Sequence, residues 1–366
     1  MAGNRPYYLY RMLRSLLAST GANSSMVTVF IDGFYHEPLA VSRLFNLRAI
    51  QQRPRARRSA RISHHYKSSL SVAFELFPLA EFAIIFEEDL DIAQDALVYF
   101  SQTLGLLKAD PSLYCVSAWN DQGYEHSVGS ANLLYRIETM PGLGWMLSRK
   151  LYKHELEPNW PSAEQAHDWD MWIRTESMRK GRECIIPDIS RTFHFGSTGT
   201  NINSYFQRQY FSHHAFNLVP QDKFDNLNLL TKEPYERLME QLIGGANVVQ
   251  NQIGKDNSSE AALHSLCSLA DFKRPHLMGA GASEPSGGQS VLAGETNVIY
   301  IDMIDRQDFS TWLKLAKCWR IWDLDARGQH NSMWRLFLGG KHTIVVGVPV
   351  SPYAKFKPPH LVPFKL

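Results

Sequence analysis

Short apolar runs that alternate with helical patterns constrain the fold of this chain more than any other feature of its sequence. Five apolar residues near the start share helical spacing: Leu9, Met12, Leu13, Leu16 and Leu17. Further helical patterns lie near 37–45, near 65–77 and from 92 onward, and strand-like runs lie at 26–31, 82–86 and 113–117. Because strands that alternate with helices usually pair in parallel, we expect an α/β fold with a largely parallel sheet.

The apolar run at 82–86 ends in three consecutive carboxylates, Glu87, Glu88 and Asp89. Its short, unbroken apolar character predicts a strand buried on both faces. Adjacent acids repel one another, and when partly buried they need a cation, a hydrogen-bond network or a proton. Ligands of open α/β sheets bind beyond the carboxyl ends of strands, so a metal site and a solvated turn both fit this position. Asp91 is followed by a helical pattern and is predicted to be a helix N-cap.

A second acidic segment, HDWDMWIRTE, has a helical composition. Asp168 is a candidate cap, and Arg174 follows Asp170 at the spacing of an ordinary surface ion pair. The alternative is that Asp170, beside Trp169, is a general base that takes a proton from a sugar hydroxyl. Tryptophan faces stack on sugar rings, although they fill protein cores equally well.

Gly142 and Gly144 are separated by one residue and are followed directly by Trp145. This pattern predicts a tight backbone turn at a place where a ligand can approach the chain closely.

The composition is that of a globular protein, with 366 residues, 44% hydrophobic and 20% charged. A net charge of +2 gives no general argument for binding nucleic acid or a membrane surface. One local exception is the group Arg53, Arg55, Arg57, Arg58 and Arg61. We interpret it as a solvated basic loop, with an anion-facing role as the alternative.

No run of 18 apolar residues is present, so no membrane-spanning helix is expected, and the start of the chain does not resemble a signal peptide. Four cysteines and two Asn-Ser-Ser sequences, at Asn23 and Asn257, are compatible with a secretory compartment. If the cysteines are oxidised, their number allows three connectivities.

Residues 254–296 are rich in Gly, Ser, Asn, Pro and Ala and are predicted to be a flexible linker or long loop. The linker separates a main domain at 1–253 from a smaller C-terminal extension at 297–366. Within this extension, we expect a strand at 298–303, a helix near 311–316 and a strand at 343–348.

Several long segments resemble the β-1,2-N-acetylglucosaminyltransferases of glycosyltransferase family 13. They are LKADPSLYCVSAWNDQGYEH, LLYRIETMPGLGWML, ELEPNWP, DWDMWIR and RKGRECIIPDISRTFHFG. Others are similar to the members of the family that act on O-linked mannose: NRPYYLYRMLRSLL, VTVFIDGFY, FEEDLDIA, LAKCWRIWDLDARG and VVGVPVSPY. Members that act on N-glycans are similar through the main domain only.

The resemblance implies a GT-A-type nucleotide-sugar fold and inverting transfer of N-acetylglucosamine from UDP-GlcNAc to the 2-hydroxyl of O-linked mannose on a glycoprotein. It implies a lumenal enzyme of the Golgi membrane, with no nucleic-acid partner. The alternatives are transfer to an N-glycan mannoside and an inactive carbohydrate-binding homologue. Retention of both Asp89 and Asp170 argues against the inactive homologue.

The resemblance also implies roles for individual residues. Asp89 would bind Mn²⁺, and Asp170 would be the catalytic base. The expected donor-binding residues are Arg5, Asp32, His65, Glu87, Glu88 and Asn201. The expected acceptor-binding residues are Trp145, Trp169, Trp322 and Arg327. A disulfide between Cys115 and Cys184 is implied, which leaves Cys267 to pair with Cys318.

The family begins its catalytic domain with an apolar strand directly before the Asn-Arg-Pro segment. Here that segment follows Met1-Ala-Gly, so we expect the first strand, the stem and the membrane anchor to be missing from the sequence as written. Loss of a central strand would expose unpaired backbone groups and apolar surface on its neighbours.

Overall fold

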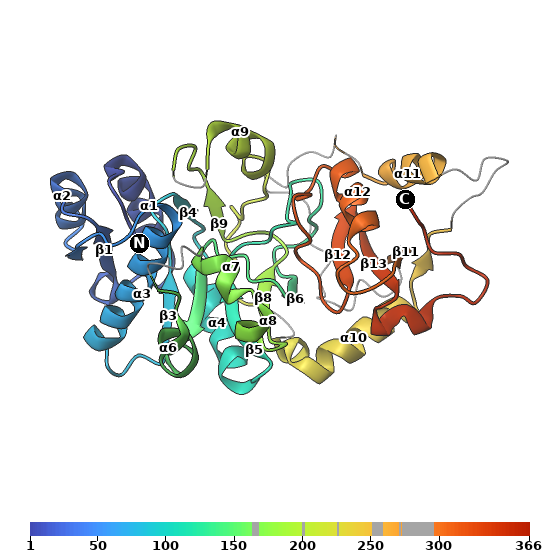
Figure 1. Ribbon diagram of the computed structural model, residues 1–366, viewed down its shortest axis with the longest axis horizontal. Helices are drawn as coiled ribbons and strands as arrows, with labels where there is room; N and C mark the ends of the chain where they lie inside the picture. The colour runs from blue at the N-terminus through green and yellow to red at the C-terminus, as the bar shows by residue number, and fades with distance from the viewer. Residues whose placement is uncertain (163–167, 200–201, 225–226, 251–258, 271, 273–295) are drawn as a thin grey trace. The chain divides into compact units, whose positions relative to one another are not determined.

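The computed structural model describes the whole chain except residues 163–167, 200–201, 225–226, 251–258, 271 and 273–295 (Figure 1). The described residues form two compact units. Unit 1 consists of Met1–Trp119, Met140–Ile186 and Ser190–Lys223, and unit 2 consists of Asn120–Thr139, Pro187–Ile189 and Phe224–Leu366. This division differs from a single boundary at residue 253, because three stretches before that residue belong to unit 2.

Unit 1 combines helices with short strands. Its longer helices are α1 (Pro6–Ala18), α2 (His36–Leu44), α3 (Arg58–Leu76) and α4 (Ala96–Ala109). Its short helices are α5 (Arg149–Leu151), α6 (Glu157–Asn159), α7 (Trp169–Ile173), α8 (Glu176–Arg179) and α9 (Ser204–Phe206). Its strands are β1 (Thr28–Asp32), β2 (Arg48–Gln52), β3 (Phe82–Ile85), β4 (Leu90–Ile92), β5 (Leu113–Ser117), β7 (Trp145–Ser148), β8 (Glu183–Pro187) and β9 (Thr192–His194). The α/β class is therefore confirmed.

The strands of unit 1 are only partly parallel. β1 pairs in parallel with β2, and the central strands follow the order β3-β7-β5-β8. β5 and β8 are parallel, whereas β7 runs antiparallel to both β3 and β5. The prediction of a largely parallel sheet is wrong for β7. Parallel neighbours are joined by a crossover connection that is usually a helix, and none of the described residues between β5 and β7 forms a helix.

The strand predicted before the acidic triplet is confirmed as β3, but its burial on both faces is not. Only Ile85 is buried, and Ile84 is 38% exposed. β3 is an edge strand that pairs only with β7 in its sheet, so its side chains are less buried than those of a central strand.

The predicted N-cap at Asp91 is wrong. Asp91 lies in β4, which pairs antiparallel with β9, and α4 begins only at Ala96 with Asp95 at the N-cap position. The Asp91 carboxylate instead accepts hydrogen bonds from the Arg11 guanidinium. A ladder partner about 100 residues away overrides the local capping pattern.

Unit 2 contains β6 (Leu134–Ile137), α10 (Lys232–Gly244), β10 (Asn247–Val248), α11 (Ser259–Cys267), β11 (Asn297–Met303), α12 (Ser310–Cys318), β12 (Met333–Leu338) and β13 (Lys341–Pro349). One sheet has the order β10-β11-β13-β12, with β11 parallel and β12 antiparallel to β13. The two strands and the helix predicted here are confirmed as β11, α12 and β13. The predicted linker at 254–296 lies largely outside the described residues, and α11 is a helix within it.

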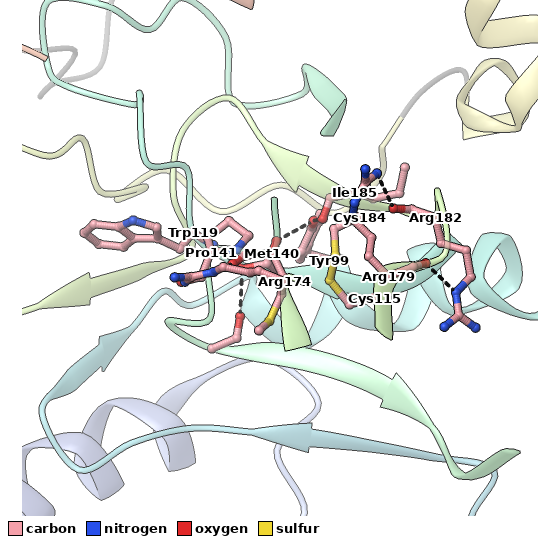
Figure 2. Close-up of a disulfide and its surroundings, with 12 residues drawn as sticks. Tyr99, Cys115, Trp119, Met140, Pro141, Arg174, Arg179, Arg182, Cys184 and Ile185 are labelled. Atoms are coloured by element: carbon pink, nitrogen blue, oxygen red, sulfur yellow. Dashed lines mark hydrogen bonds between the residues drawn. A yellow bond between two sulfur atoms is a disulfide. The ribbon is translucent and has the colours of Figure 1, made fainter. Parts of the chain in front are cut away.

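Both implied disulfides are present. Cys115 and Cys184 are joined across the neighbouring strands β5 and β8, where the two residues face each other in the register (Figure 2). Cys267 and Cys318 join the ends of α11 and α12. Among the described residues, no helix is long and apolar enough to cross a membrane.

Candidate functional site

The acidic triplet follows β3 and is held by charged and polar groups from distant parts of unit 1. Glu88 is buried, and its carboxylate accepts from the Arg5 Nε at 2.6 Å and from the Gly3 backbone N–H at 2.9 Å. Arg5 also donates to the backbone oxygen of Thr198 at 2.8 Å. These bonds place the start of α1 directly beside the triplet.

Asp89 is buried between two positively charged or ionisable groups. Its Oδ2 accepts from Arg5 Nη2 at 2.9 Å and lies 3.6 Å from His194 Nε2. Burial alone would raise the pKa of Asp89, but His194 and Arg5 outweigh it and hold the pKa at about 2. Burial lowers the pKa of His194, and Asp89 and Gln207 together raise it above its usual value. Asp89 is therefore a carboxylate at neutral pH.

Unlike Glu88 and Asp89, Glu87 forms no ion pair with any residue that the structure describes. Its carboxyl group accepts from the Tyr66 hydroxyl. Burial and the adjacent charge of Asp89 raise its pKa to about 7. Burial and the charge of Glu87 raise the pKa of Tyr66 in turn, so the phenol remains a hydrogen-bond donor.

Tyr66 also connects the triplet to the second acidic segment. Its ring stacks on Trp169 with the centroids 4.1 Å apart, and Trp169 stacks on Trp145 at 5.5 Å. Trp145 is fully buried and Trp169 nearly so. Both tryptophans therefore pack in the interior of unit 1, in a stack that begins at Tyr66. The Trp145 side chain has no exposed surface that an acceptor sugar could contact.

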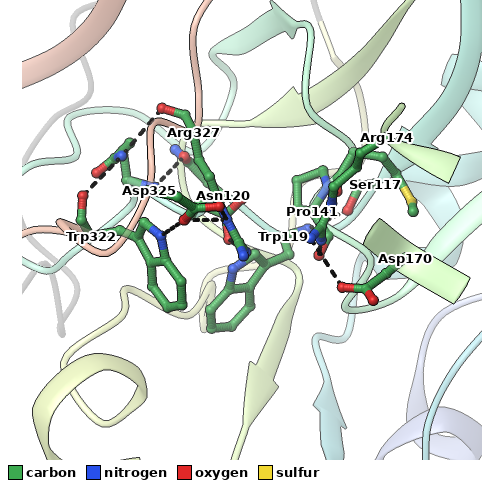
Figure 3. A network of polar contacts seen from close by, with 12 residues as sticks. Ser117, Trp119, Asn120, Pro141, Asp170, Arg174, Trp322, Asp325 and Arg327 are labelled. Carbon is green, nitrogen blue, oxygen red and sulfur yellow. Dashed lines mark hydrogen bonds and ion pairs between the residues drawn. The ribbon is translucent and has the colours of Figure 1, made fainter. Parts of the chain in front are cut away.

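Asp170 follows Trp169 in α7 and is the more accessible acid of this region. Its side chain is 33% exposed and lies 3.0 Å from Arg174 Nη1, which confirms the expected i,i+4 pair (Figure 3). Arg174 is anchored in turn, because its guanidinium donates to the backbone oxygens of Met140 and Pro141. Asp170 is thus a positioned carboxylate with a solvent-facing side. Asp168 occupies the N-cap position of α7 without a side-chain capping bond.

The predicted glycine turn lies beside the same elements. Gly142 and Gly144 both have positive φ, at 90° and 86°. A Cβ on Gly144 would lie 2.7 Å from a methyl carbon of Thr192, so the chain passes β9 more closely than any side chain allows.

The remaining donor-site predictions fall on β1 and α3. Asp32, at the end of β1, accepts from Arg61 Nε at 2.6 Å. His65 is buried, and its Nδ1 lies 2.9 Å from the side-chain oxygen of Gln52. Burial lowers the pKa of His65 to about 3. Asn201 lies outside the described residues.

The two acceptor residues predicted from the C-terminal region lie together in unit 2. The Arg327 guanidinium covers the Trp322 ring at 4.3 Å, and Trp322 Nε1 donates to Asp325 (Figure 3). Arg327 also donates to Asp325 at 2.9 Å and to Asp121 at 3.3 Å. These contacts make Trp322 and Arg327 neighbours, and their role in acceptor binding stays a prediction.

Asp89 fits a divalent cation only as a single ligand. Its Oδ1 is buried and has no hydrogen-bond partner among the described residues, as expected of an atom that binds a ligand. Among the described residues, however, no three His, Cys, Asp or Glu side chains gather around one point. A cation here would take its other ligands from a bound diphosphate or from water.

Sequence reasoning missed two residues of this site. His194 lies in the RTFHFG segment that carried the resemblance, and only the β4–β9 ladder brings it to Asp89. Tyr66 follows His65 in α3, in a segment for which the sequence predicts only a helix. Its neighbours Glu87 and Trp169 are distant in sequence, so no local signal could have identified it.

Comparison with known proteins identifies the family of this chain. A profile described as GNT-I family matches residues 35–262, which include the acidic triplet and Asp170. An alpha-1,3-mannosyl-glycoprotein 2-beta-N-acetylglucosaminyltransferase of Arabidopsis thaliana is 33% identical over 264 residues. The alignment covers 68% of this chain, and the chain spans only 58% of that relative.

Among solved structures, a glycosyltransferase involved in the glycosylation of the major capsid of PBCV-1 matches with a TM-score of 0.27 and 10% identity. That match covers 54% of this chain and 92% of the other, and it carries no argument about the fold. The profile match, which extends over more than half of the chain, and the identity to the plant relative show that this chain belongs to the GNT-I family.

Proposed function

We propose that this chain transfers N-acetylglucosamine from UDP-GlcNAc, in β-1,2 linkage, to the 2-hydroxyl of a mannose on a glycoprotein. The observation that carries the proposal is the GNT-I family match, because it spans both the acidic triplet and Asp170. Family membership also supports the GT-A-type fold, the inverting outcome and a place in the Golgi lumen.

Two acceptor classes remain, and different observations favour them. The plant relative is named for an α-1,3-mannosyl glycoprotein, which supports the N-glycan mannoside as acceptor. The O-mannose acceptor is supported by the C-terminal segments LAKCWRIWDLDARG and VVGVPVSPY, which lie beyond the family match at residue 262. The comparisons favour the N-glycan acceptor, and the O-mannose acceptor is the second candidate.

In the proposed reaction, Asp170 takes the proton of the attacking mannose hydroxyl. The pair with Arg174 fixes the direction of its carboxylate, and the exposed side of Asp170 leaves room for a sugar. The deprotonated oxygen then attacks the anomeric carbon from the side opposite to UDP, which inverts the configuration there. A single displacement needs no covalent nucleophile.

The acidic triplet would serve the donor side of the same reaction. Asp89 presents its unpaired Oδ1, and a Mn²⁺ ion held there would stabilise the negative charge of departing UDP. Arg5 and His194 keep Asp89 ionised, and Arg5 adds a positive charge near the expected diphosphate. The pKa of Glu87 is raised to about 7, so a part of the Glu87 carboxyl groups is protonated at neutral pH. The carboxylic acid O–H would then donate a hydrogen bond to the donor sugar.

The test is transfer of labelled N-acetylglucosamine from UDP-GlcNAc to two acceptors in parallel. One acceptor is a glycopeptide with a terminal α-1,3-mannose on an N-glycan, and the other is a mannosyl-Ser/Thr peptide. Product on either one supports the reaction, and the preferred acceptor decides between the two classes. Absence of product on both, from protein that still binds UDP in the presence of Mn²⁺, would favour the carbohydrate-binding homologue.

A further inference from the structure

A basic loop, defined as residues 53–58 with the sequence RPRARR, connects β2 to α3 in unit 1. Its four arginines are all exposed: Arg53, Arg55, Arg57 and Arg58. In the part of the chain that the structure describes, none of these four has an ion-pair or hydrogen-bond partner for its guanidinium group. Arg61, one turn further on, differs because it is bound to Asp32. The basic loop therefore presents four unneutralised positive charges to solvent.

The start of α3 is poorly stabilised beside this loop. Arg57 is its N-cap residue and supplies no capping hydrogen bond, and the first turn contains no acid. The positive end of a helix dipole disfavours cations, yet arginines occupy this end. Ala56 and Arg58 also have positive φ, at 63° and 51°, which is strained for residues with a Cβ. We expect the first turn of α3 to open more readily than the rest of the helix.

We propose that the peptide bond between Arg58 and Ser59 is a processing site for an endoprotease that recognises clustered arginines. Arg58, Arg57 and Arg55 occupy the first, second and fourth positions before this bond. A calcium-dependent serine endoprotease of the proprotein-convertase class binds such side chains in acidic subsites. Water is the co-reactant: the carbonyl carbon of Arg58 gains a hydroxyl group and becomes a carboxylate, and the nitrogen of Ser59 leaves as an amine.

Other arginine pairs in the chain have the same spacing, but the fold places them in surroundings that differ from those of the Arg58–Ser59 bond. Arg179 and Arg182 have the same spacing as Arg55 and Arg58, but Arg179 is paired with Glu176 and Arg182 with Glu155. Arg11 and Arg14 repeat the spacing in the interior of α1, whereas the Arg58–Ser59 bond lies in the first turn of α3. The two disulfides suit an oxidising secretory compartment, in which proteases of this class act.

Cleavage would divide the candidate site between two chains. Fragment 1–58 would carry Arg5 and Asp32, and fragment 59–366 would carry the acidic triplet and Asp170. Both disulfides lie within the larger fragment, so no covalent bond would join the two pieces. They would be held only by contacts such as those of Arg5 with Glu88 and Asp89. The cleavage proposal does not depend on the proposed function.

The experiment treats the folded, full-length chain with a purified calcium-dependent convertase and follows it by non-reducing gel electrophoresis. We expect two bands without reduction, and we expect the larger fragment to begin Ser-Ala-Arg-Ile-Ser. Arg55→Ala should slow cleavage by at least tenfold because it removes the fourth-position arginine. Arg53→Ala is the matched control, since it removes an equally exposed charge of the same loop and should be cleaved at the wild-type rate.

A synthetic peptide covering residues 50–64 provides the reference for an unfolded site. Ala60 is buried two residues beyond the bond, so the first turn of α3 must open for the protease to reach it. Cleavage of the peptide with the folded chain left intact would overturn the proposal, because the fold would then protect the bond. Cleavage at another bond, or equal rates for wild type and Arg55→Ala, would overturn it as well.

Discussion

Nη2 of Arg5 lies 2.9 Å from Oδ2 of Asp89, although 84 residues separate the two in the sequence. The same guanidinium bonds Glu88, so one arginine neutralises two buried carboxylates. Burying such acids without a partner would be costly. The start of α1 is thereby tied to the acidic triplet.

Arg5→Ala should lower the free energy of unfolding by about 2 kcal/mol, between the values typical of surface and buried ion pairs. Urea unfolding measures this loss. Arg11→Ala is the control, because the Arg11 side chain is 53% exposed in its pair with Asp91, against 29% for Arg5, and the pair should contribute less than about 1 kcal/mol. Equal losses in the two variants would contradict a special role for Arg5.

Asp89→Asn should weaken the Mn²⁺-dependent binding of UDP by at least about tenfold, because it removes the negative charge of the carboxylate whose buried Oδ1 has no hydrogen-bond partner among the described residues. Isothermal titration with UDP, with and without Mn²⁺, measures the effect. Asp91→Asn serves as the comparison, since Asp91 is a nearby acid that pairs with Arg11. If Asp89→Asn bound UDP and Mn²⁺ like the wild type, Asp89 would not be the metal ligand.

Asp170→Asn should reduce the rate of transfer by about 10²- to 10⁴-fold while UDP binding stays unchanged, as expected on removal of a general base. The initial rate at saturating UDP-GlcNAc measures the loss. Asp168→Asn is the matched variant, because Asp168 lies in the same segment and makes no side-chain capping bond. Normal turnover in Asp170→Asn would exclude it as the base.

His65 should make the protein less stable in acid. Its pKa is about 3 in the folded state and about 6.5 in the unfolded chain, so the unfolded state binds more protons between these values. Stability is therefore fully present above pH 6.5 and falls below it, by up to about 1.4 kcal/mol per pH unit.

Urea unfolding at several pH values between 4 and 7 measures that slope, and His65→Gln should flatten it. His64→Gln should change it less, because His64 is the more exposed of the two neighbours. A slope that survives in His65→Gln would assign the acid sensitivity to another group.

Much of the fold could be predicted because the patterns that encode it are local. α1, α2, β5, β11 and α12 follow from apolar spacing within a single element. Predictions failed where pairing between distant elements decided the outcome. β7 reverses direction within its sheet, and Asp91 joins a β4–β9 ladder instead of capping a helix. The disulfide pairs came from the family resemblance and are confirmed.

By itself, the sequence determined the identity of the acids and the pair of Asp170 with Arg174, because that pair depends only on helical spacing. Only the tertiary structure decided that Arg5 and His194 flank Asp89, and that Tyr66 links Glu87 to the tryptophan beside Asp170. The physical reason is the distance along the sequence over which each kind of interaction acts. A local pattern fixes which face of an element is apolar, whereas many arrangements of the elements satisfy that pattern, and long-range packing selects the one that buries these charges together.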